Sequence, residues 1–268
     1  MLSPDWTSPN GSVALYKRDC CEVLPQLPAR SVHLAFVDPP FNLGKDYEDE
    51  MAPEAYVAWI GHCLSHICSR VTFNGSIYVM TRQERVGDMM AILGTYAAFR
   101  NLIVWFNSSM PARTRYCLGY QPILYYVMDP HSYIFNHGVQ RRVSKAALPW
   151  GRTNKGCSIK DIWDDIPFVS GGCMASKEAV LAPGTKRKAH PAQMPMALAT
   201  RAILHSSNPG DTVLDPMMGS GTAMEAAIRV GRKAIGIEIR QDYFALACER
   251  VTRTLLDLQN GPQPPRPS

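Results

Sequence analysis

The sequence predicts an α/β fold in which a doubly wound, mostly parallel sheet carries helices on both faces. Strand-like runs alternate with helix-like segments along most of the 268 residues, the order that joins parallel strands through helices. The run from Val32 to Val37 is apolar almost throughout, as in a strand buried on both faces. A second strand, Asp211 to Leu214, leads directly into a glycine-rich turn and a helix.

We expect the elements in the following order. The first half of the chain predicts strands at Val13 to Tyr16 and Val32 to Val37, a helix at Ala52 to Arg70, a strand at Ser76 to Met80, a helix at Glu84 to Leu93, and strands at Leu102 to Phe106 and Ile123 to Met128. The dipeptide Asn74-Gly75 indicates a turn before the third strand. The second half predicts a helix from about Met194 to Ser206, the strand at Asp211 to Leu214, a helix that begins near Thr222, and a strand at Lys233 to Ile237.

The composition is typical of a globular protein with a sizeable core. Hydrophobic residues make up 46% and charged residues 19% of the chain, whose length allows one large domain with an insert. The net charge of +5 is only weak evidence for a nucleic-acid partner, because many proteins share such an excess. Neither a signal-peptide pattern nor a run of 18 apolar residues occurs, so we expect a cytoplasmic protein with no membrane partner.

Cysteine and histidine usage gives no strong metal signal. The eight cysteines include no Cys-x2-Cys pair, and we expect reduced thiols. His62, Cys63, His66 and Cys68 share one predicted helix, and the two histidines are one turn apart. That spacing can bind zinc, but a distant second ligand pair and the glutamate of metalloprotease motifs are missing. We interpret the four residues as a partly buried helix face and predict no metal.

The tetrapeptide Asp38-Pro39-Pro40-Phe41 directly follows the apolar strand. Ligand crevices open at the carboxyl ends of parallel strands. Because the two prolines donate no backbone N–H, this corner presents acceptors, the Asp38 carboxylate and the Pro39 carbonyl, beside the aromatic face of Phe41. Acceptors next to a stacking surface suit an amino group on a flat heterocycle.

A second motif, Asp215-Pro216-Met217-Met218-Gly219-Ser220-Gly221-Thr222, follows the strand at 211–214. Gly219 and Gly221 allow a ligand to approach the backbone and offer N–H groups at the start of a helix, which favours a carboxylate or phosphate. Glu238 ends the next strand, about 20 residues after this turn, where an acid can accept hydrogen bonds from ribose hydroxyls. The motif therefore predicts a nucleoside cofactor.

The identity of that cofactor follows by elimination. A dinucleotide turn requires a third glycine, where this chain has Met224, and no Gly-x4-Gly-Lys-Ser/Thr phosphate loop occurs. NAD and ATP are thereby disfavoured. S-adenosylmethionine requires only a ribose acceptor, an adenine slot and a backbone cradle for its amino-acid end. Methyl transfer to nitrogen is the reaction that fits both motifs.

These motifs resemble those of the amino-methylating DNA methyltransferases, which act on adenine N6 or cytosine N4, in their permuted beta group. The stretches that carry the resemblance are Asp38 to Tyr47, Asn101 to Trp105, Asp161 to Pro167, and His190-Pro191 through Glu238. Their order places the catalytic motif first, a recognition insert next and the cofactor loop last. The resemblance extends from about Ala14 to about Val251 and implies a permuted Rossmann-like methyltransferase fold.

Motifs and resemblance together assign catalysis to Asp38, Pro39, Pro40 and Phe41, and cofactor binding to Asp215, Pro216, Met217, Gly219, Ser220, Gly221, Thr222, Glu238 and His190. Asp38 favours adenine N6, because cytosine N4 members more often carry serine at that position. Two positions depart from the family pattern: Met217 replaces the usual phenylalanine and Met194 a common lysine. A thioether can still pack against an adenine ring, so we expect activity to survive.

The expected domain organisation is a catalytic half at 1–129, a target-recognition insert at 130–188, a cofactor-binding half at 189–258 and a disordered tail at 259–268. Between Gly138 and His190, ten basic residues outnumber four acidic ones, a local charge of +6: Arg141, Arg142, Lys145, Arg152, Lys155, Lys160, Lys177, Lys186, Arg187 and Lys188 against Asp161, Asp164, Asp165 and Glu178. We interpret this charge as DNA-facing, with a solvated loop face as the alternative.

Double-stranded DNA is the expected partner, and the target base must be flipped out because a paired base cannot present its amine. Three alternatives remain open: cytosine N4 methylation by the same site, methylation of RNA or of a protein amide, and a non-catalytic DNA-binding subunit. Intact Asp38 and an intact glycine turn oppose the last. The resemblance further implies a homodimer and a cognate restriction nuclease as partners. The predicted methyl transfer requires the two motifs to meet in one cleft.

Overall fold

A computed structural model of the chain describes residues 2–42, 51–110, 116–139, 159–169, 178–181, 189–190 and 192–261, with the backbone alone for 107–110. The strands are β1 (Trp6–Thr7), β2 (Val13–Tyr16), β3 (Val32–Val37), β4 (Val71–Met80), β5 (Ala98–Met110), β6 (Leu118–Val127), β7 (Ile162–Trp163), β8 (Thr212–Asp215) and β9 (Lys233–Ile237). The helices are α1 (Cys20–Val23), α2 (Pro53–Arg70), α3 (Val86–Gly94), α4 (Met196–Ser206), α5 (Thr222–Arg229) and α6 (Gln241–Asn260), with short 3₁₀ helices η1 (Leu24–Gln26) and η2 (Gln83–Arg85). Of these described helices, none is long and apolar enough to cross a bilayer.

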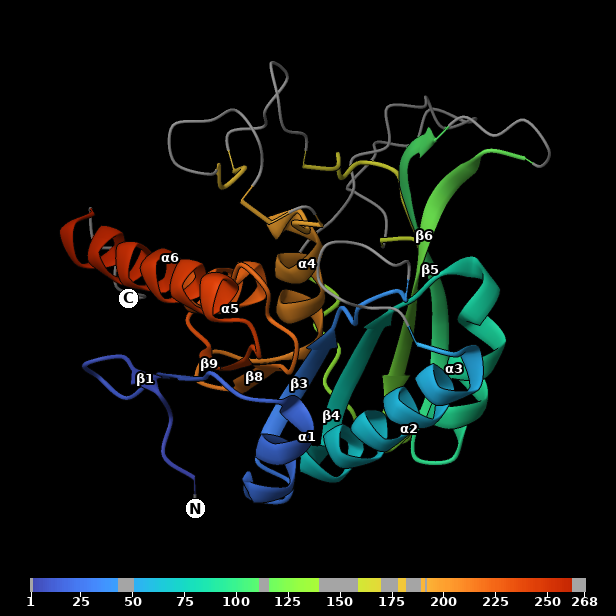
Figure 1. Cartoon of the computed structure of the whole chain (residues 1–268), viewed down its shortest axis with the longest axis horizontal. Helices are drawn as coiled ribbons and strands as arrows, with labels where there is room; N and C mark the ends of the chain where they lie inside the picture. Colours follow the sequence, from blue (N-terminus) through green and yellow to red (C-terminus); the bar gives the residue numbers. More distant parts are fainter. Residues whose placement is uncertain are drawn as a thin grey trace.

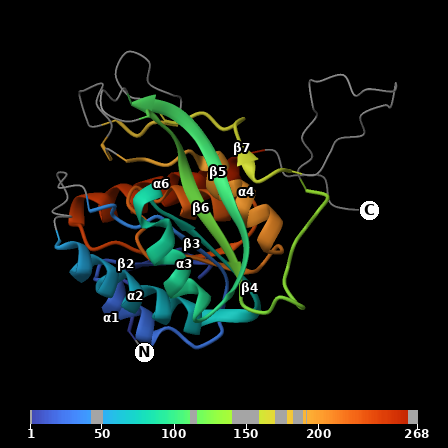
Figure 2. The same cartoon turned by 90° about the vertical axis from the view of Figure 1, so that its right-hand side faces the viewer.

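One sheet organises the molecule, with the strand order β1-β2-β9-β8-β3-β4-β6-β5-β7 (Figures 1 and 2). Neighbouring strands from β2 to β4 in this order are parallel, whereas β6 runs antiparallel to both β4 and β5. The predicted mostly parallel sheet is thus confirmed. β3 and β8 are distant in sequence but adjacent in the sheet, with Leu34 opposite Val213 and Ala35 opposite Leu214. This pairing joins the two halves of the chain.

Helices cover both faces of the sheet, as a doubly wound fold requires (Figures 1 and 2). α4, α5 and α6 contribute to the core on one face, and α1, α2 and α3 to the core on the other. β3 serves both layers: Leu34 and Phe36 belong to the first core, and Val32, Ala35 and Val37 to the second. All five side chains are fully buried. This two-sided burial explains why the strand is apolar at successive positions.

The four residues considered as possible zinc ligands, His62, Cys63, His66 and Cys68, lie on different sides of the amphipathic helix α2. Cys63 and Cys68 lie on its buried side. His62 is exposed, and its Nε2 lies 3.2 Å from Nε2 of His66. The four side chains therefore do not form one site, because cysteines and histidines occupy different sides of the helix.

Some element boundaries differ from the prediction. α4 begins at Met196 instead of Met194, because Pro195 has an extended backbone and disfavours helical geometry in the residue before it. The helix predicted from Glu84 begins as the 3₁₀ turn η2 before it continues as α3. The short elements β1, α1, η1 and β7 and the long helix α6 were not predicted from the sequence.

The turn predicted at Asn74-Gly75 is an irregularity inside β4 instead of a break before it. Val71 pairs with Val32, but Ser76 already pairs with Leu34, so β4 contains extra residues between the two pairs. A Cβ on Gly75 would lie 2.7 Å from the carbonyl oxygen of His33. Glycine is required here because the neighbouring strand's backbone comes too close for a side chain.

Part of the predicted recognition insert belongs to the sheet. β7 extends it beyond β5, with Trp163 opposite Trp105. The Trp105 indole N–H donates to the Ile166 carbonyl at 2.8 Å, and Arg201 of α4 donates two hydrogen bonds to Asp165 at 2.9 and 2.8 Å. Residues 159–169 are thus anchored to the core.

Outside the described residues lie the tail from Gln263 and most of the basic insert: Arg141, Arg142, Lys145, Arg152, Lys155, Lys177, Lys186, Arg187 and Lys188.

Gly236 in β9 provides a test of this packing. A Cβ there would lie 2.9 Å from a Leu15 methyl group, 2.9 Å from the Met224 sulfur, and closer still to the Met218 sulfur. We expect Gly236→Ala to lower the free energy of unfolding by about 1–3 kcal/mol, the usual cost of overpacking. Gly87→Ala, which meets no atom within 4 Å, is the control and should leave the melting temperature equal or slightly higher. Equal melting temperatures for the two variants would contradict this account of the core.

Candidate active site

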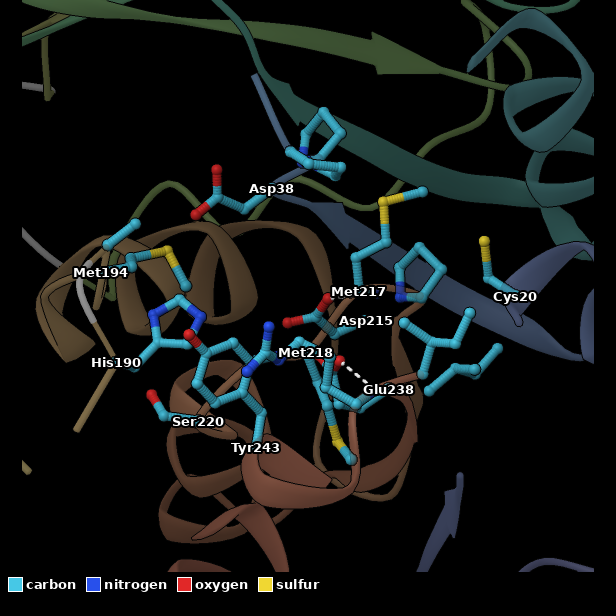
Figure 3. Close-up of a pocket in the computed structure, with 18 of the residues that line it drawn as sticks. Cys20, Asp38, His190, Met194, Asp215, Met217, Met218, Ser220, Glu238 and Tyr243 are labelled. Atoms are coloured by element: carbon cyan, nitrogen blue, oxygen red, sulfur yellow. Dashed lines mark hydrogen bonds between the residues drawn. The ribbon is translucent and has the colours of Figure 1, made fainter. Parts of the chain in front are cut away.

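The structure brings both predicted motifs into one pocket. β3, β8 and β9 are parallel neighbours, so Asp38, Asp215 and Glu238 at their carboxyl ends lie along the same edge of the sheet. A cavity of about 220 Å³ opens there (Figure 3). It is lined by every predicted site residue except Gly221: Asp38, Pro39, Pro40, Phe41, His190, Asp215, Pro216, Met217, Gly219, Ser220, Thr222 and Glu238.

α2 holds the Asp38-Pro39-Pro40-Phe41 corner in place. Tyr56 is 3% exposed, and its hydroxyl donates a 2.9 Å hydrogen bond to the Pro40 carbonyl. Asp38 keeps part of its surface open toward the pocket, but burial raises the pKa of its carboxyl to about 7. A fixed corner thus presents a carboxyl group that changes its charge near neutral pH.

Three carboxyl groups share the pocket. Burial is the main cause that raises the pKa of Asp215 well above its ordinary value, and the nearby charges of Asp38 and Glu238 raise it further. Burial likewise raises the pKa of Glu238. Two arginines on the lining have acidic partners: Arg18 lies 3.8 Å from Asp5, and Arg240 lies 2.8 Å from Asp242. Such an acidic pocket favours a ligand that carries positive charge.

The glycine turn is held by its own hydrogen bonds. The Gly219 N–H donates to the Glu238 carboxylate at 2.9 Å, and the Gly221 N–H donates to the Met218 carbonyl at 2.8 Å. The expectation that both N–H groups face a ligand is therefore wrong, because each already has a partner within the protein. The Ser220 side chain remains on the pocket lining as a polar group for a ligand.

Both glycines of the turn adopt left-handed backbone angles, with φ of +50° at Gly219 and +78° at Gly221. A Cβ on Gly219 would lie 2.9 Å from His190 Nε2, so a side chain there would occupy the pocket wall. A Cβ on Gly221 would lie 3.0 Å from the Ala247 Cβ of α6. Gly221 thus allows α5 and α6 to pack closely behind the pocket, whereas Gly219 leaves space on its surface.

A buried ion pair supports the turn from behind. Arg250 of α6 is 3% exposed and forms a short hydrogen-bonded ion pair with Glu225 of α5. Its guanidinium also donates to the Thr222 hydroxyl at 2.9 Å and lies 3.4 Å from the Ser220 carbonyl oxygen. Arg250 was not predicted as a site residue. Arg250 lies in α6, a helix not predicted from the sequence, so no sequence signal marked it.

Some residues of the pocket lining were also not predicted as site residues. The ring centroids of Tyr243 and His190 lie 4.3 Å apart (Figure 3). The Arg240 guanidinium lies 4.7 Å from the centroid of the Tyr243 ring. Ile239 also lines the pocket and is 62% exposed. Ile239 and Arg240 directly follow Glu238 in the sequence, so their position next to a predicted site residue is the signal that could have identified them. Tyr243 becomes recognisable only from its contact with His190.

Comparison with known proteins decides the family. The family model described as DNA methylase, for N6 and N4 methyltransferases, matches residues 32–249, which is most of the chain. The chain belongs to the DNA methylase family. The resemblance inferred from the motifs is thereby confirmed. Within this DNA methylase the catalytic motif precedes the cofactor turn along the chain, as in the permuted arrangement.

Individual relatives agree with the assignment. The DNA methylase is 32% identical over 253 residues to DNA adenine methyltransferase YhdJ of Escherichia coli K12, covering 90% of this chain and 83% of the relative. Among solved structures, the cytosine-N4-specific PvuII DNA methyltransferase has a TM-score of 0.69 at 19% identity, over 97% of this chain and 96% of that one. M1.HpyAVI in its complex with SAM has a TM-score of 0.57 at 21% identity, over 89% and 99%. At these identities the two structures support the fold.

The residues of the pocket fit S-adenosylmethionine, the cofactor of this family. Its sulfonium and ammonium groups are cations that suit the acidic lining. Gly219 leaves room where a side chain would intrude. The hydrogen bonds from Gly219 and Arg240 use part of the Glu238 carboxylate's capacity of about four acceptor sites, so it can still accept from a hydroxyl group.

The buried ion pair leads to a prediction about the cofactor turn. Arg250→Met keeps the length of the side chain but removes the donors to Glu225 and Thr222. We expect a loss in the free energy of unfolding near the low end of about 3–5 kcal/mol, because Arg229 still pairs with Glu225, together with weaker cofactor binding. Chemical denaturation and calorimetric titration measure the two effects. Arg253→Met on the exposed side of α6 is the control, and an equal loss in both variants would contradict a specific role for Arg250.

Proposed function

We propose that this DNA methylase transfers a methyl group from S-adenosylmethionine to the exocyclic N6 amine of an adenine flipped out of double-stranded DNA. One observation carries the proposal. The Asp38 corner and the turn at Gly219, from distant parts of the chain, line one cavity of about 220 Å³. A base and a methyl donor held in such a cavity would react without crossing solvent.

Two considerations favour adenine over cytosine. The first position of the catalytic motif is Asp38, which is the residue typical of adenine N6 enzymes in the resemblance drawn from the sequence. A curated relative at 32% identity over most of the chain is named as a DNA adenine methyltransferase. Cytosine N4 presents the same amino group to the same acceptors, so it is the main competing substrate.

The proposed chemistry starts from the low nucleophilicity of the adenine amine, whose lone pair is delocalised into the ring. Hydrogen bonds from its two N–H groups to the Asp38 carboxylate and the Pro39 carbonyl would favour a pyramidal nitrogen with an available lone pair. The ionised Oδ atoms of Asp38 would also accept the proton that the nitrogen loses after methylation. Phe41 would stack on the base, and flipping would cost a few kcal/mol.

On the cofactor side, S-adenosylmethionine supplies a methyl group bound to a positively charged sulfur. Glu238 would accept hydrogen bonds from the ribose hydroxyls, and Met217 and exposed Ile239 would offer apolar surface to the adenine ring. Asp215 and Ser220 would bind the amino-acid end, and His190 would close that side of the pocket against Tyr243.

We propose further that the basic insert contacts DNA phosphates and reads bases, with its described segment at 159–169 fixed to the sheet by Trp163 and Asp165. The four-part division into residues 1–129, 130–188, 189–258 and 259–268 stays a prediction. So do a homodimer, a cognate restriction nuclease, and a cytoplasmic, nucleoid-associated location.

Substitutions on the two sides of the pocket should separate cofactor binding from methyl transfer. We expect Asp38→Ala to retain S-adenosylmethionine binding and to lose methylation by at least about 100-fold, because the amine loses its charged acceptor. Glu238→Ala should weaken cofactor binding by roughly tenfold or more, because a ribose acceptor is lost. Calorimetry and tritium transfer to DNA measure binding and turnover, and each variant is the control for the other. Undiminished turnover in Asp38→Ala would exclude its catalytic role.

The pH dependence follows from Asp38. Burial raises its pKa to about 7, and only the ionised form is a full acceptor for the amine. Raising the pH therefore increases activity: kcat/KM should rise about tenfold per unit below about pH 7 and level off above it. Initial rates at constant ionic strength between about pH 5 and about pH 9 measure this. A profile that is flat through pH 7, or that falls with increasing pH there, would contradict the proposal.

The identity of the methylated base is decided by nucleoside analysis. DNA from cells that express the protein is digested and its nucleosides are separated by mass spectrometry. We expect N6-methyladenine, absent from cells that express Asp38→Ala. Detection of N4-methylcytosine instead would support the same active site and identify cytosine as the target base. Neither product on DNA, with activity on RNA, would overturn the proposed function.

A further inference from the structure

A group of three thiols lies beside the cofactor pocket and plays no part in the proposed chemistry. Cys20 and Cys21 begin α1, and Cys63 comes from the buried side of α2. Their sulfur atoms lie within 4.8 Å of one another. The Cys63 sulfur is 3.8 Å from that of Cys20 and 2.9 Å from that of Cys21. Cys20 lies on the pocket lining, as Figure 3 shows, so the group adjoins the active site.

The spacing suits a soft cation. Zinc–sulfur bonds of about 2.3 Å at tetrahedral angles place two sulfur ligands about 3.7 Å apart, close to the Cys20–Cys63 separation. Cys21 would have to move away from Cys63 by less than an ångström to reach the same spacing. Cys21 is only partly buried, so the group is accessible to an ion from solvent.

The arrangement of the three sulfurs favours a cation over a disulfide. A disulfide between Cys21 and Cys63, the pair with the shorter separation, would use only two of the three sulfurs. One cation would contact all three, because they lie within 4.8 Å of one another.

We propose that Cys20, Cys21 and Cys63 form a metal site for one thiophilic cation, such as Zn²⁺, bound by three thiolates with a fourth position open. Binding would release three thiol protons to solvent, so affinity for the metal would rise with pH. The metal would connect α1 to α2 beside the pocket. This site replaces the metal-free interpretation of Cys63 and excludes His62 and His66, which lie on another side of α2.

The test uses the full chain, stripped with a chelator under reducing conditions and titrated with Cd²⁺ as a spectroscopic substitute for zinc. We expect thiolate-to-metal charge-transfer absorption that saturates at one ion per chain, and a melting temperature that rises with metal concentration. Calorimetry in two buffers of different ionisation enthalpy should give a release of about three protons. Cys63→Ser removes a direct ligand, so affinity should fall by more than the roughly 10–100-fold that the loss of an outer-shell partner costs.

Matched variants keep the test decisive. Cys68→Ser changes a second buried thiol on α2, outside the group, and Cys117→Ser changes an exposed one; both should bind as the parent does. If Cys63→Ser does not fold, Cys21→Ser at the partly buried position carries the same expectation. Unchanged affinity in the ligand variants would overturn the proposal. So would a Cys21–Cys63 disulfide in peptide maps of protein alkylated at lysis, which would identify an oxidised pair instead.

Discussion

Parallel pairing of β3, β8 and β9 is the constraint on which the site depends. Backbone hydrogen bonds between these strands bring Asp38 next to Asp215 and Glu238, although about 180 residues separate the first from the second. The strands are buried on both faces, so a shift of register would expose apolar side chains as well as misplace the acids. Core packing and active-site geometry are therefore determined by the same register, and the two functions of the sheet cannot be separated.

Bringing three acidic side chains together in the pocket lowers the stability of the protein when no cofactor is bound. Burial disfavours the ionised form of each carboxyl group, and their mutual repulsion adds to that cost. Glu238 regains part of it through hydrogen bonds from backbone N–H groups, and Arg250 neutralises Glu225 directly behind the turn. A bound cofactor with positive charge would offset a further part of this electrostatic cost. The rigid support behind the pocket thus maintains an arrangement that isolated carboxylates would not adopt.

The sheet also connects the segment at 159–169 to the Asp38 corner. β7 lies in the range assigned to the insert, yet it pairs with β5, and Asp165 is held by Arg201 of α4. The insert is therefore attached to the same framework as the Asp38 corner, which α2 fixes through Tyr56. α2 carries the proposed metal ligand Cys63 on the same buried side. The Asp38 corner and the thiol group consequently share one helix as their support.

The sequence by itself determined the strand and helix periods, both motifs and the cofactor class, because these depend on local residue types: an apolar run, a Pro-Pro corner, a glycine turn and an acid at fixed spacing. Prolines and glycines also limited local accuracy: Pro195 shifted the start of one helix, and Gly75 lies in an irregularity inside β4 instead of a turn before it. Only the tertiary structure decided that Gly219 donates to Glu238, that Gly221 faces α6, that Arg250 supports the turn, and that Cys20, Cys21 and Cys63 meet. Such contacts join residues far apart in the chain, and no local pattern records which distant side chain will complete a pair.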